Sequence, residues 1–510
     1  MVKRATSLFS IDVISPESLG QPAHVRIWER IRAAILSGAL PLNARLPSSR
    51  TLARDLRVAR NTVDEALGQL VADGFIVRRR GAGSFVASRL PQHRTLQPLP
   101  RKETKRRRPD PRLSNRAKAL LSYPGHRKPI EPIPFTPSLP PGDAFPRKIW
   151  RRLLNREAGR AGADYWNFGA SNGLPALREA IAAHANAMRA TKASADQIVV
   201  TTSTQQAVEL AAKVLADPGE FAWVETPGYQ PVQYCLRAAG LDVVPVPVDQ
   251  QGLDVQAGRS LQSHARLAYV TPSHQFPLGY ELSLGRRRAL LEWAEGEGAY
   301  VVEDDYDGDY RYEGRPIASL QGMDCDRVIY VGSFNKILFP GLRIAYAIVP
   351  ESLVGPFMDA KHTADGHTAL LPQGALAAFI SEGHLAQHLR ATRAVYNERR
   401  LTFLAEAESL QGLLEFGPAV AGIHVTGVFK DASLNDRAVT QECARRGIAV
   451  DPLSKFGAVK RGGLVFGFAG ASRQAMRAGI AVVRQAILGQ RRAEGIPQEW
   501  QDSRRRTSGT

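Results

Sequence analysis

The chain has 510 residues, of which 44% are hydrophobic, so it is long enough to form at least two folded domains. Its formal net charge of +18 is concentrated at one end, because residues 1–130 hold 26 Lys and Arg against 9 Asp and Glu, whereas the remaining 380 residues hold 41 against 40. A polyanion partner is therefore expected for the first quarter of the chain. The chain has three cysteines without metal-ligand spacing, which argues against a disulfide-rich secreted protein and against a metal site. It has no N-terminal apolar segment and no apolar stretch of about 20 residues, which argues against a signal peptide and a membrane span. Together these features predict a reduced cytoplasmic protein.

The basic N-terminal part contains three predicted helices and a hairpin. Apolar residues at helical spacing predict a helix over residues 24–37, and the run Pro-Ser-Ser-Arg predicts a second helix, capped by Ser48 or Ser49 and ending near residue 56. A third helix is expected over residues 60–70, with its apolar residues on one face. Residues 74–86 then predict a β-hairpin with an arginine-rich tip. This order is typical of a winged helix-turn-helix, whose recognition helix enters the major groove with its N-terminal end.

Residues 91–130 predict a basic flexible linker. They hold twelve basic and two acidic residues, several prolines and almost no periodic apolar pattern, so the segment repels itself and extends. Two interpretations stay open and are compatible with each other. The linker either makes non-specific contacts with DNA phosphates or is a soluble tether that is basic by composition.

From residue 131 onward, short apolar strands alternate with amphipathic helices. Strands are expected at 198–202, 221–225, 241–246, 267–271, 300–304 and 328–332, with helices such as 205–215 and 284–295 between them. The alternation predicts an α/β domain with a mainly parallel sheet and helices on both faces, in which ligands bind beyond the carboxyl ends of the strands. Five polar or aromatic residues fall at or just beyond those ends: Ser203, Tyr229, His274, Asp304 and Ser333.

Lys336 is the residue that points most directly to a chemistry. It lies downstream of an acidic strand end, and pyridoxal 5'-phosphate (PLP) requires such a pair, because a lysine amine forms a Schiff base with its aldehyde and a carboxylate pairs with its pyridinium nitrogen. Asp304 is the expected carboxylate. Ser333 and Arg343 lie near Lys336 in the sequence and suit a phosphate group.

Two family resemblances cover most of the chain. Residues 24–88 resemble the GntR family of bacterial repressors, and residues from about 134 to 490 resemble fold-type I PLP enzymes of the class I/II aminotransferase group, through segments 173–178, 202–206, 225–229, 271–279, 303–306 and 330–343. Together they resemble the MocR/GabR subfamily of PLP-dependent transcriptional regulators. The implied organisation is a winged helix-turn-helix at 20–90, a linker at 91–130 and a PLP-binding effector domain at 131–490.

The resemblance implies a role for each matched residue. Lys336 would form the internal aldimine, Asp304 would pair with the ring nitrogen, Tyr306 would bond the ring 3-oxygen and Tyr229 would stack on the ring. The phosphate would be held by the turn that begins a helix, together with two later side chains: Ser203, Thr204, Gln205, Ser333 and Arg343. DNA would be contacted by residues of the second helix, the third helix and the wing tip: Arg50, Arg60, Asn61, Thr62, Arg80 and Gly81.

Three positions depart from the patterns of these families. Asp64 replaces a basic residue that some GntR members carry. His274 stands where aminotransferases usually place an asparagine, and it is expected to contact the cofactor oxygen region. Val465 stands where many members have an arginine that clamps the substrate carboxylate, so α-carboxylate binding would need another group, such as Arg461 or Arg473.

Three functions are compatible with this sequence. The favoured one is a transcriptional regulator that binds operator DNA and senses a small amine or amino acid through external aldimine formation. The family resemblance implies that it would do so as a head-to-tail homodimer. The alternative is an aminotransferase with a fused DNA-binding domain, so residual transaminase activity stays open. In the third, the PLP domain is a dimerisation scaffold, and the intact pair of Lys336 and Asp304 argues against it.

Overall fold

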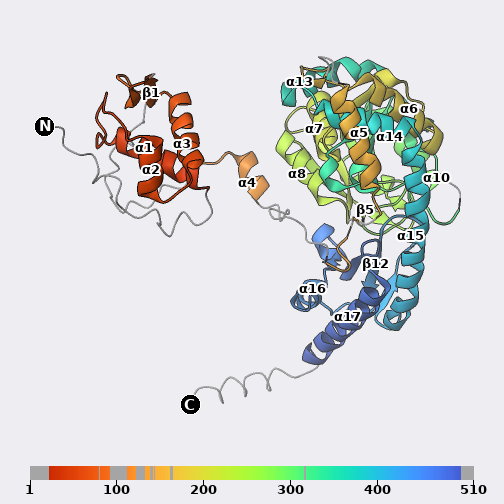
Figure 1. The fold of residues 1–510 in the computed structure, drawn as a ribbon. Helices are drawn as coiled ribbons and strands as arrows, with labels where there is room; N and C mark the ends of the chain where they lie inside the picture. The colour runs from red at the N-terminus through yellow and green to blue at the C-terminus, as the bar shows by residue number, and fades with distance from the viewer. Residues whose placement is uncertain are drawn as a thin grey trace, which may run out of the picture. The chain divides into compact units, whose positions relative to one another are not determined.

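A computed structural model describes residues 22–79, 81–91, 112–121, 133–137, 140, 142, 144–160, 165–314 and 317–494. They fall into two compact units, one within residues 1–111 and one within residues 112–510 (Figure 1). Among these residues, no helix is both long enough and apolar enough to cross a membrane.

The first unit has the predicted winged helix-turn-helix arrangement. Helices α1 (Ala23–Leu36), α2 (Ser49–Leu56) and α3 (Arg60–Ala72) pack around a small apolar core, and β1 (Ile76–Arg79) pairs antiparallel with β2 (Gly83–Val86) to form the wing. Ser48 is the N-cap of α2, where its hydroxyl accepts a hydrogen bond from the amide of Thr51 at 3.2 Å. The apolar face of α3 is buried as expected, which leaves its polar N-terminal end exposed or half-buried.

A helix lies inside the segment that the sequence analysis treats as linker. Helix α4 (Asn115–Leu121) begins where the hydroxyl of Ser114 accepts a hydrogen bond from the amide of Ala117 at 3.1 Å, and it packs against helix α8 (Gln230–Ala239). The run Ala-Lys-Ala-Leu-Leu has high helix propensity, but it is too short to show a clear helical period of apolar residues.

The second unit is built on an eight-stranded sheet. Its strand order is β3 (Ile198–Thr201), β10 (Ala345–Ile348), β9 (Val328–Ser333), β8 (Tyr300–Asp305), β7 (Leu267–Val270), β4 (Phe221–Thr226), β5 (Asp242–Asp249) and β6 (Gly252–Leu253). The pairs from β9 to β5 are parallel. Strand β10 is antiparallel to both β3 and β9, so β3 runs in the same direction as the central strands. The mainly parallel sheet is confirmed, and β10 is a strand that the sequence analysis did not predict.

Helices cover both faces of this sheet. One face packs against α7 (Thr204–Leu215), α8 and α13 (Val354–Asp365), and the other packs against α9 (Val255–Leu261), α10 (Leu284–Glu297) and α11 (Leu320–Met323). Neighbouring residues of β4 therefore enter different cores, with Val224 in the first and Trp223 stacked on Trp293 at 3.9 Å in the second.

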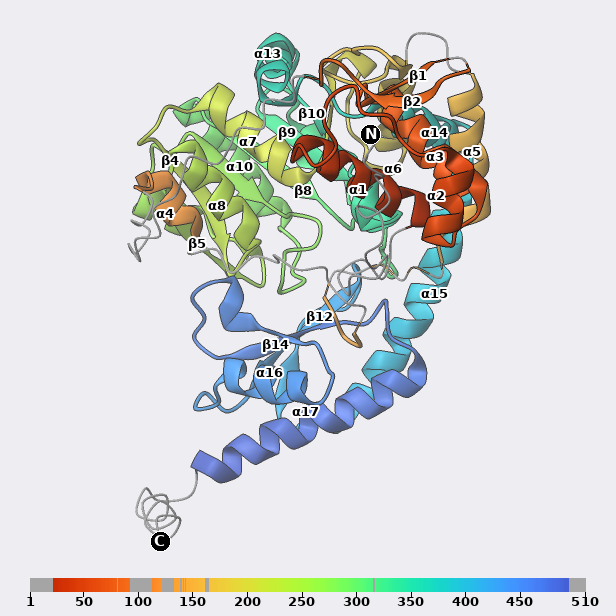
Figure 2. The same ribbon diagram turned by 60° about the vertical axis from the view of Figure 1, so that its left-hand side comes forward.

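A second, smaller sheet completes the unit. Its strands are β11 (Leu414–Phe416), β12 (His424–Phe429), β14 (Gly463–Gly467) and β13 (Asp451–Pro452), all antiparallel, and α16 (Asp436–Arg445) and α17 (Arg473–Glu494) pack beside it. The 24-residue helix α15 (His384–Ala407) leads from the region of the large sheet to this lobe (Figures 1 and 2). The remaining helices are α5 (Arg147–Gly159), α6 (Pro175–Arg189), α12 (Phe334–Ile337) and α14 (Leu370–Ser381).

Candidate functional site

The strand directions bring the predicted site residues to one edge of the large sheet. Strands β3, β4, β7, β8 and β9 all run the same way, so their carboxyl ends lie at the same edge. Asp304 is the penultimate residue of β8, and Ser333 is the last residue of β9. Ser203 and Tyr229 are the N-caps of α7 and α8. His274 follows β7. This edge is the place where a parallel sheet binds ligands.

Asp304 differs from the acidic residues on either side of it. One oxygen of its carboxylate accepts a hydrogen bond from the hydroxyl of Tyr269 at 2.5 Å, whereas its Oδ1 is buried without a hydrogen-bond partner among the described residues. Glu303 accepts from the amides of Leu320 and Gln321, and Asp305 is paired with a guanidinium. Only Asp304 of the three therefore keeps a buried oxygen available for a further donor.

Burial changes the proton affinities of the two central groups. It raises the pKa of Asp304 to about 7, against the hydrogen bond from Tyr269, which lowers it. Desolvation lowers the pKa of Lys336 to about 8, against the raising effect of Asp307 and then Asp304. A lysine with such a pKa has a substantial neutral fraction near pH 8, and the neutral amine is the form that attacks a carbonyl carbon.

Tyr306 and His274, which the sequence analysis predicts to lie near the cofactor oxygen, contact each other. The hydroxyl of Tyr306 lies 3.0 Å from both Nδ1 and the backbone oxygen of His274, and Nδ1 lies 3.0 and 3.2 Å from the two oxygens of Asp307. The sequence analysis missed Asp307 and Tyr269. Asp307 continues the acidic run that marks the end of β8, so its position was a usable signal, whereas Tyr269 sits in an apolar strand that carries none.

The residues predicted to hold a phosphate lie around two helix starts. The hydroxyl of Ser203 accepts from the amide of Gln206 at 3.3 Å, so the first amides of the twelve-residue helix α7, including those of Thr204 and Gln205, point toward the strand ends. The hydroxyl of Ser333 accepts from the amide of Asn335 at 3.3 Å. Arg343 is exposed in the turn before β10, with a φ of 55°.

Val465 stands where the family resemblance suggests an arginine, and its surroundings are apolar. Val465 is buried in β14 and packs with Phe276, Leu453 and Phe456, and Tyr229 and Tyr306 border this cluster. Arg461, one of the two alternatives, pairs with Glu415 at 3.0 Å on the surface of the lobe. The other, Arg473, is exposed at the start of α17.

The residues predicted to bind DNA form an exposed surface on the first unit. Arg50 is exposed on α2, Arg60 and Asn61 are exposed and Thr62 half-buried at the N-terminal end of α3, and Gly81 is exposed at the tip of the wing with a φ of 77°. Arg80 lies outside the described residues. Asp64, the acidic departure, forms an ion pair of 3.4 Å with the side chain of Arg60 one turn earlier.

Comparisons with known proteins agree with this two-part architecture. Residues 24–86 match the model of the bacterial regulatory proteins of the gntR family, and residues 140–483 match that of aminotransferase class I and II. The probable rhizopine catabolism regulatory protein MocR of Rhizobium meliloti is 36% identical over 480 residues, which cover 93% of this chain and 96% of the relative. The pyridoxine biosynthesis transcriptional regulator PdxR of Corynebacterium glutamicum is 30% identical over 466 residues, covering 91% and 95%.

Solved structures show the same fold for the second unit. The kynurenine aminotransferase of Pyrococcus horikoshii superposes with a TM-score of 0.67 at 24% identity, and the match covers 74% of this chain and 97% of that enzyme. At this identity the likeness concerns the fold. An archaeal alanine:glyoxylate aminotransferase gives the same TM-score at 25% identity, covering 74% and 97%.

Proposed function

Because this chain belongs to the family of HTH-type transcriptional regulators that join a gntR module to an aminotransferase class I and II domain, we propose that it binds PLP at Lys336 and senses a small amine there. The observation that carries the proposal is the unpartnered, buried Oδ1 of Asp304 at the same sheet edge as Lys336. An isolated buried carboxylate oxygen is unfavourable, and a protonated pyridine nitrogen would supply the missing donor.

The residues at the edge of the sheet fit the parts of this cofactor. Lys336 would hold it covalently through Nζ, and Asp304 would hold a proton at the ring nitrogen. Tyr229 and Tyr306 offer an aromatic face and a hydroxyl at the same site. The amides at the start of α7 and the hydroxyl of Ser333 provide donors for the phosphate, and Arg343 would add its positive charge by turning inward.

The chemistry divides between cofactor and protein. When bound, PLP supplies a carbon on which one amine can replace another, together with a ring that withdraws electrons. The protein keeps the amine of Lys336 desolvated, with its pKa lowered to about 8, so that it releases its proton easily. Tyr269 fixes one oxygen of Asp304, so the other oxygen would be available to the ring nitrogen.

The first unit would read the operator. Arg60, Asn61 and Thr62 at the N-terminal end of α3 would enter the major groove, Arg50 would contact phosphate, and the wing tip at Arg80 and Gly81 would contact the backbone beside it. The exposure of the residues that the structure describes supports this assignment. A cytoplasmic location follows from the proposal, because the operator lies there.

Operator binding would use a head-to-tail homodimer. Trp166 and Phe168, in the segment before α6, are 69% and 93% exposed, and apolar side chains of this size are seldom left so open. A second copy of the chain is the partner that covers them in this proposal. Sedimentation should show a dimer for the natural protein and a larger monomer fraction for Phe168→Asp, and a monomeric natural protein would contradict it.

The visible absorption spectrum of the full-length protein with added PLP tests the cofactor site. The natural protein should become yellow, Lys336→Ala should stay colourless, and Lys213→Ala, which removes an exposed lysine of α7, should behave as the natural protein does. A coloured Lys336→Ala variant with the same spectrum would contradict the assignment of Lys336. Loss of the colour with an amino acid, followed by its return with a keto acid, would instead support the alternative of a working aminotransferase.

A further inference from the structure

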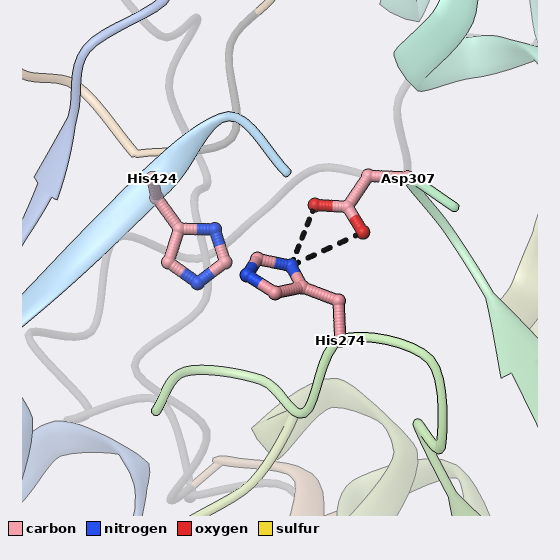
Figure 3. Close-up of side chains that lie close together, drawn as sticks. All are labelled: His274, Asp307 and His424. Carbon is pink, nitrogen blue, oxygen red and sulfur yellow. Dashed lines mark hydrogen bonds and ion pairs between the residues drawn. The ribbon is translucent and has the colours of Figure 1, made fainter. Parts of the chain in front are cut away.

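Two buried histidines at this site carry ring nitrogens that the described residues leave without a hydrogen bond. His274 follows β7 and His424 begins β12, so they come from the large and the small sheet, and their rings lie 4.9 Å apart (Figure 3). The unpartnered atoms are Nε2 of His274 and Nδ1 of His424, and both are fully buried. Such atoms are rare in folded proteins unless a ligand bonds to them.

The hydrogen-bond pattern around His424 shows what its free nitrogen needs. Its Nε2 lies 3.2 Å from the carbonyl oxygen of Pro277, which only accepts, so Nε2 carries the hydrogen. Burial, followed by the charge of His274, lowers the pKa of His424 to about 3, so its ring is neutral. Its Nδ1 is therefore a lone pair that requires a donor.

His274 presents a second unpartnered nitrogen, on the residue that the sequence analysis expects beside the cofactor. Its Nδ1 faces both oxygens of Asp307, and a carboxylate only accepts, so Nδ1 carries the hydrogen and the hydroxyl of Tyr306 donates to the backbone oxygen of His274. Its Nε2 has no hydrogen-bond partner among the described residues. Figure 3 shows this edge of the ring turned toward His424, away from Asp307.

His424 lies close to residues of the proposed PLP site. The centroid of the His424 ring is 6.4 Å from that of Tyr306 and 5.2 Å from that of Phe276. The charge of Lys336 contributes to the lowered pKa of His424. The buried members of the cluster around Val465 are apolar, and no described residue donates a hydrogen bond to either nitrogen. A donor would therefore have to come with the ligand.

A metal ion fits this pair less well than a hydrogen-bond donor does. His274, Asp307 and His424 are the one group of three possible metal ligands in the described part of the chain, with ligand atoms that lie within 4.8 Å of one another. Both oxygens of Asp307 already face Nδ1 of His274, so the nitrogens without a partner are two. Zinc sites in proteins use three or four protein ligands, and two histidine nitrogens alone fall short of that number.

We propose that Nδ1 of His424 accepts a hydrogen bond from a hydroxyl group of the effector, so that the sensed compound is an amino alcohol rather than an α-amino acid. A hydroxyl is an uncharged donor that suits a bare imidazole nitrogen in a buried site. A carboxylate would instead place another acceptor beside the lone pair of His424 and the carboxylate of Asp307, with Val465 where a guanidinium would be needed. This inference depends on the proposed PLP site.

The test compares amines that differ only in their hydroxyl groups. PLP-loaded full-length protein, kept in EDTA, is titrated with 2-amino-1,3-propanediol, isopropylamine and alanine, and with trans-2-aminocyclohexanol and cyclohexylamine, while the visible spectrum is followed. At least one amino alcohol should bind about tenfold more tightly than the amine without hydroxyls, because a site built to bond a hydroxyl discriminates against analogues that lack it. Equal binding throughout, or tightest binding of alanine, overturns the inference.

Two variants of His424 provide matched controls. In His424→Gln the longer amide can keep the bond to Pro277 but leaves no acceptor near the place of Nδ1, so the preference for hydroxyls should fall to within about twofold. In His424→Asn the shorter amide can place its oxygen near that position, so most of the preference should return. A preference that survives in His424→Gln would contradict the role of Nδ1. If neither variant folds, the titration of the natural protein decides, and a protein that never becomes yellow with PLP rejects the cofactor site itself.

Discussion

The proposed DNA-reading surface and the proposed PLP site would rely on opposite physical conditions. The residues of α2, α3 and the wing are mostly exposed and charged, so their contacts would come from long-range attraction to phosphates and would weaken with salt. Asp304 and His424 are buried and desolvated, with pKa values of about 7 and about 3. The affinity of the first region for DNA would therefore depend on the number of its charges. The ligand preference of the second region would depend on which of its buried polar atoms lack hydrogen-bond partners.

Substitution of the two neighbouring aspartates of β8 should give the largest difference, with one variant losing stability and the other losing PLP affinity. Asp305→Asn breaks a buried ion pair with Arg189 at 2.6 Å and should lower the free energy of unfolding by about 3 kcal/mol. Asp304→Asn removes no ion pair, but it should weaken PLP binding by about 100-fold, since the ring nitrogen loses its charged partner. Denaturant unfolding and PLP titration measure the two effects, and a similar loss of PLP affinity in both variants would contradict the distinction.

The pH dependence of stability sharpens the same contrast. The pKa of Asp304 is raised to about 7 in the folded protein, from 3.8, so folding binds a proton between these values and the cofactor-free protein should lose stability as pH rises from about 4 to about 7. Glu225 and Glu303, with pKa values also raised to about 7, act in the same direction. In Asp304→Asn the loss between pH 5 and pH 7.5 should be smaller by roughly 2 kcal/mol. An unchanged slope in denaturant unfolding would contradict this assignment.

Removing a charge from the proposed DNA-reading surface should change operator binding and leave PLP binding unchanged. Arg60→Ala should weaken operator binding by about tenfold and reduce the slope of log affinity against log salt by about one. The PLP spectrum should not change, because Arg60 belongs to the first unit. Fluorescence anisotropy at several salt concentrations measures the first effect, and Arg54→Ala, an exposed residue of α2 outside the predicted contacts, is the control.

The smallest expected effect concerns the start of α2. Ser48→Ala removes the hydroxyl that caps this helix and should cost about 1 kcal/mol of local stability. Hydrogen exchange of the α2 amides should become faster by about fivefold, while the PLP spectrum stays the same. Unchanged exchange would mean that the cap contributes little.

The sequence predicted those parts of the fold that repeat a local pattern. The three helices and the wing, the six parallel strands and α7 were predicted with errors of at most a few residues, because each has a clear apolar period. Strand β10 was missed, since its run Ala-Tyr-Ala-Ile is short and follows directly on the Lys336 segment. Helix α4 was missed because it lies in a basic segment without a periodic apolar face.

The candidate site was predictable only in part, for a related reason. Positions at strand ends, such as Asp304 and Ser333, follow from topology. Partners that meet through the tertiary fold do not, and so the bond from Tyr269 to Asp304 and the approach of His424 to His274 appear only in three dimensions. The sequence analysis placed His274 at the site, but it gave no reason to expect a second histidine from the small sheet.

The central claim is that an amine bound at Lys336 changes operator binding. The most direct measurement follows DNA affinity and the visible spectrum together while amines are added to PLP-loaded protein, using a DNA fragment that the protein itself selects from a random pool. An amine that shifts the spectrum should change DNA affinity by about tenfold in the natural protein and leave that of Lys336→Ala unchanged. An amine that shifts the spectrum fully without altering DNA affinity, or that alters it equally in Lys336→Ala, would contradict the claim.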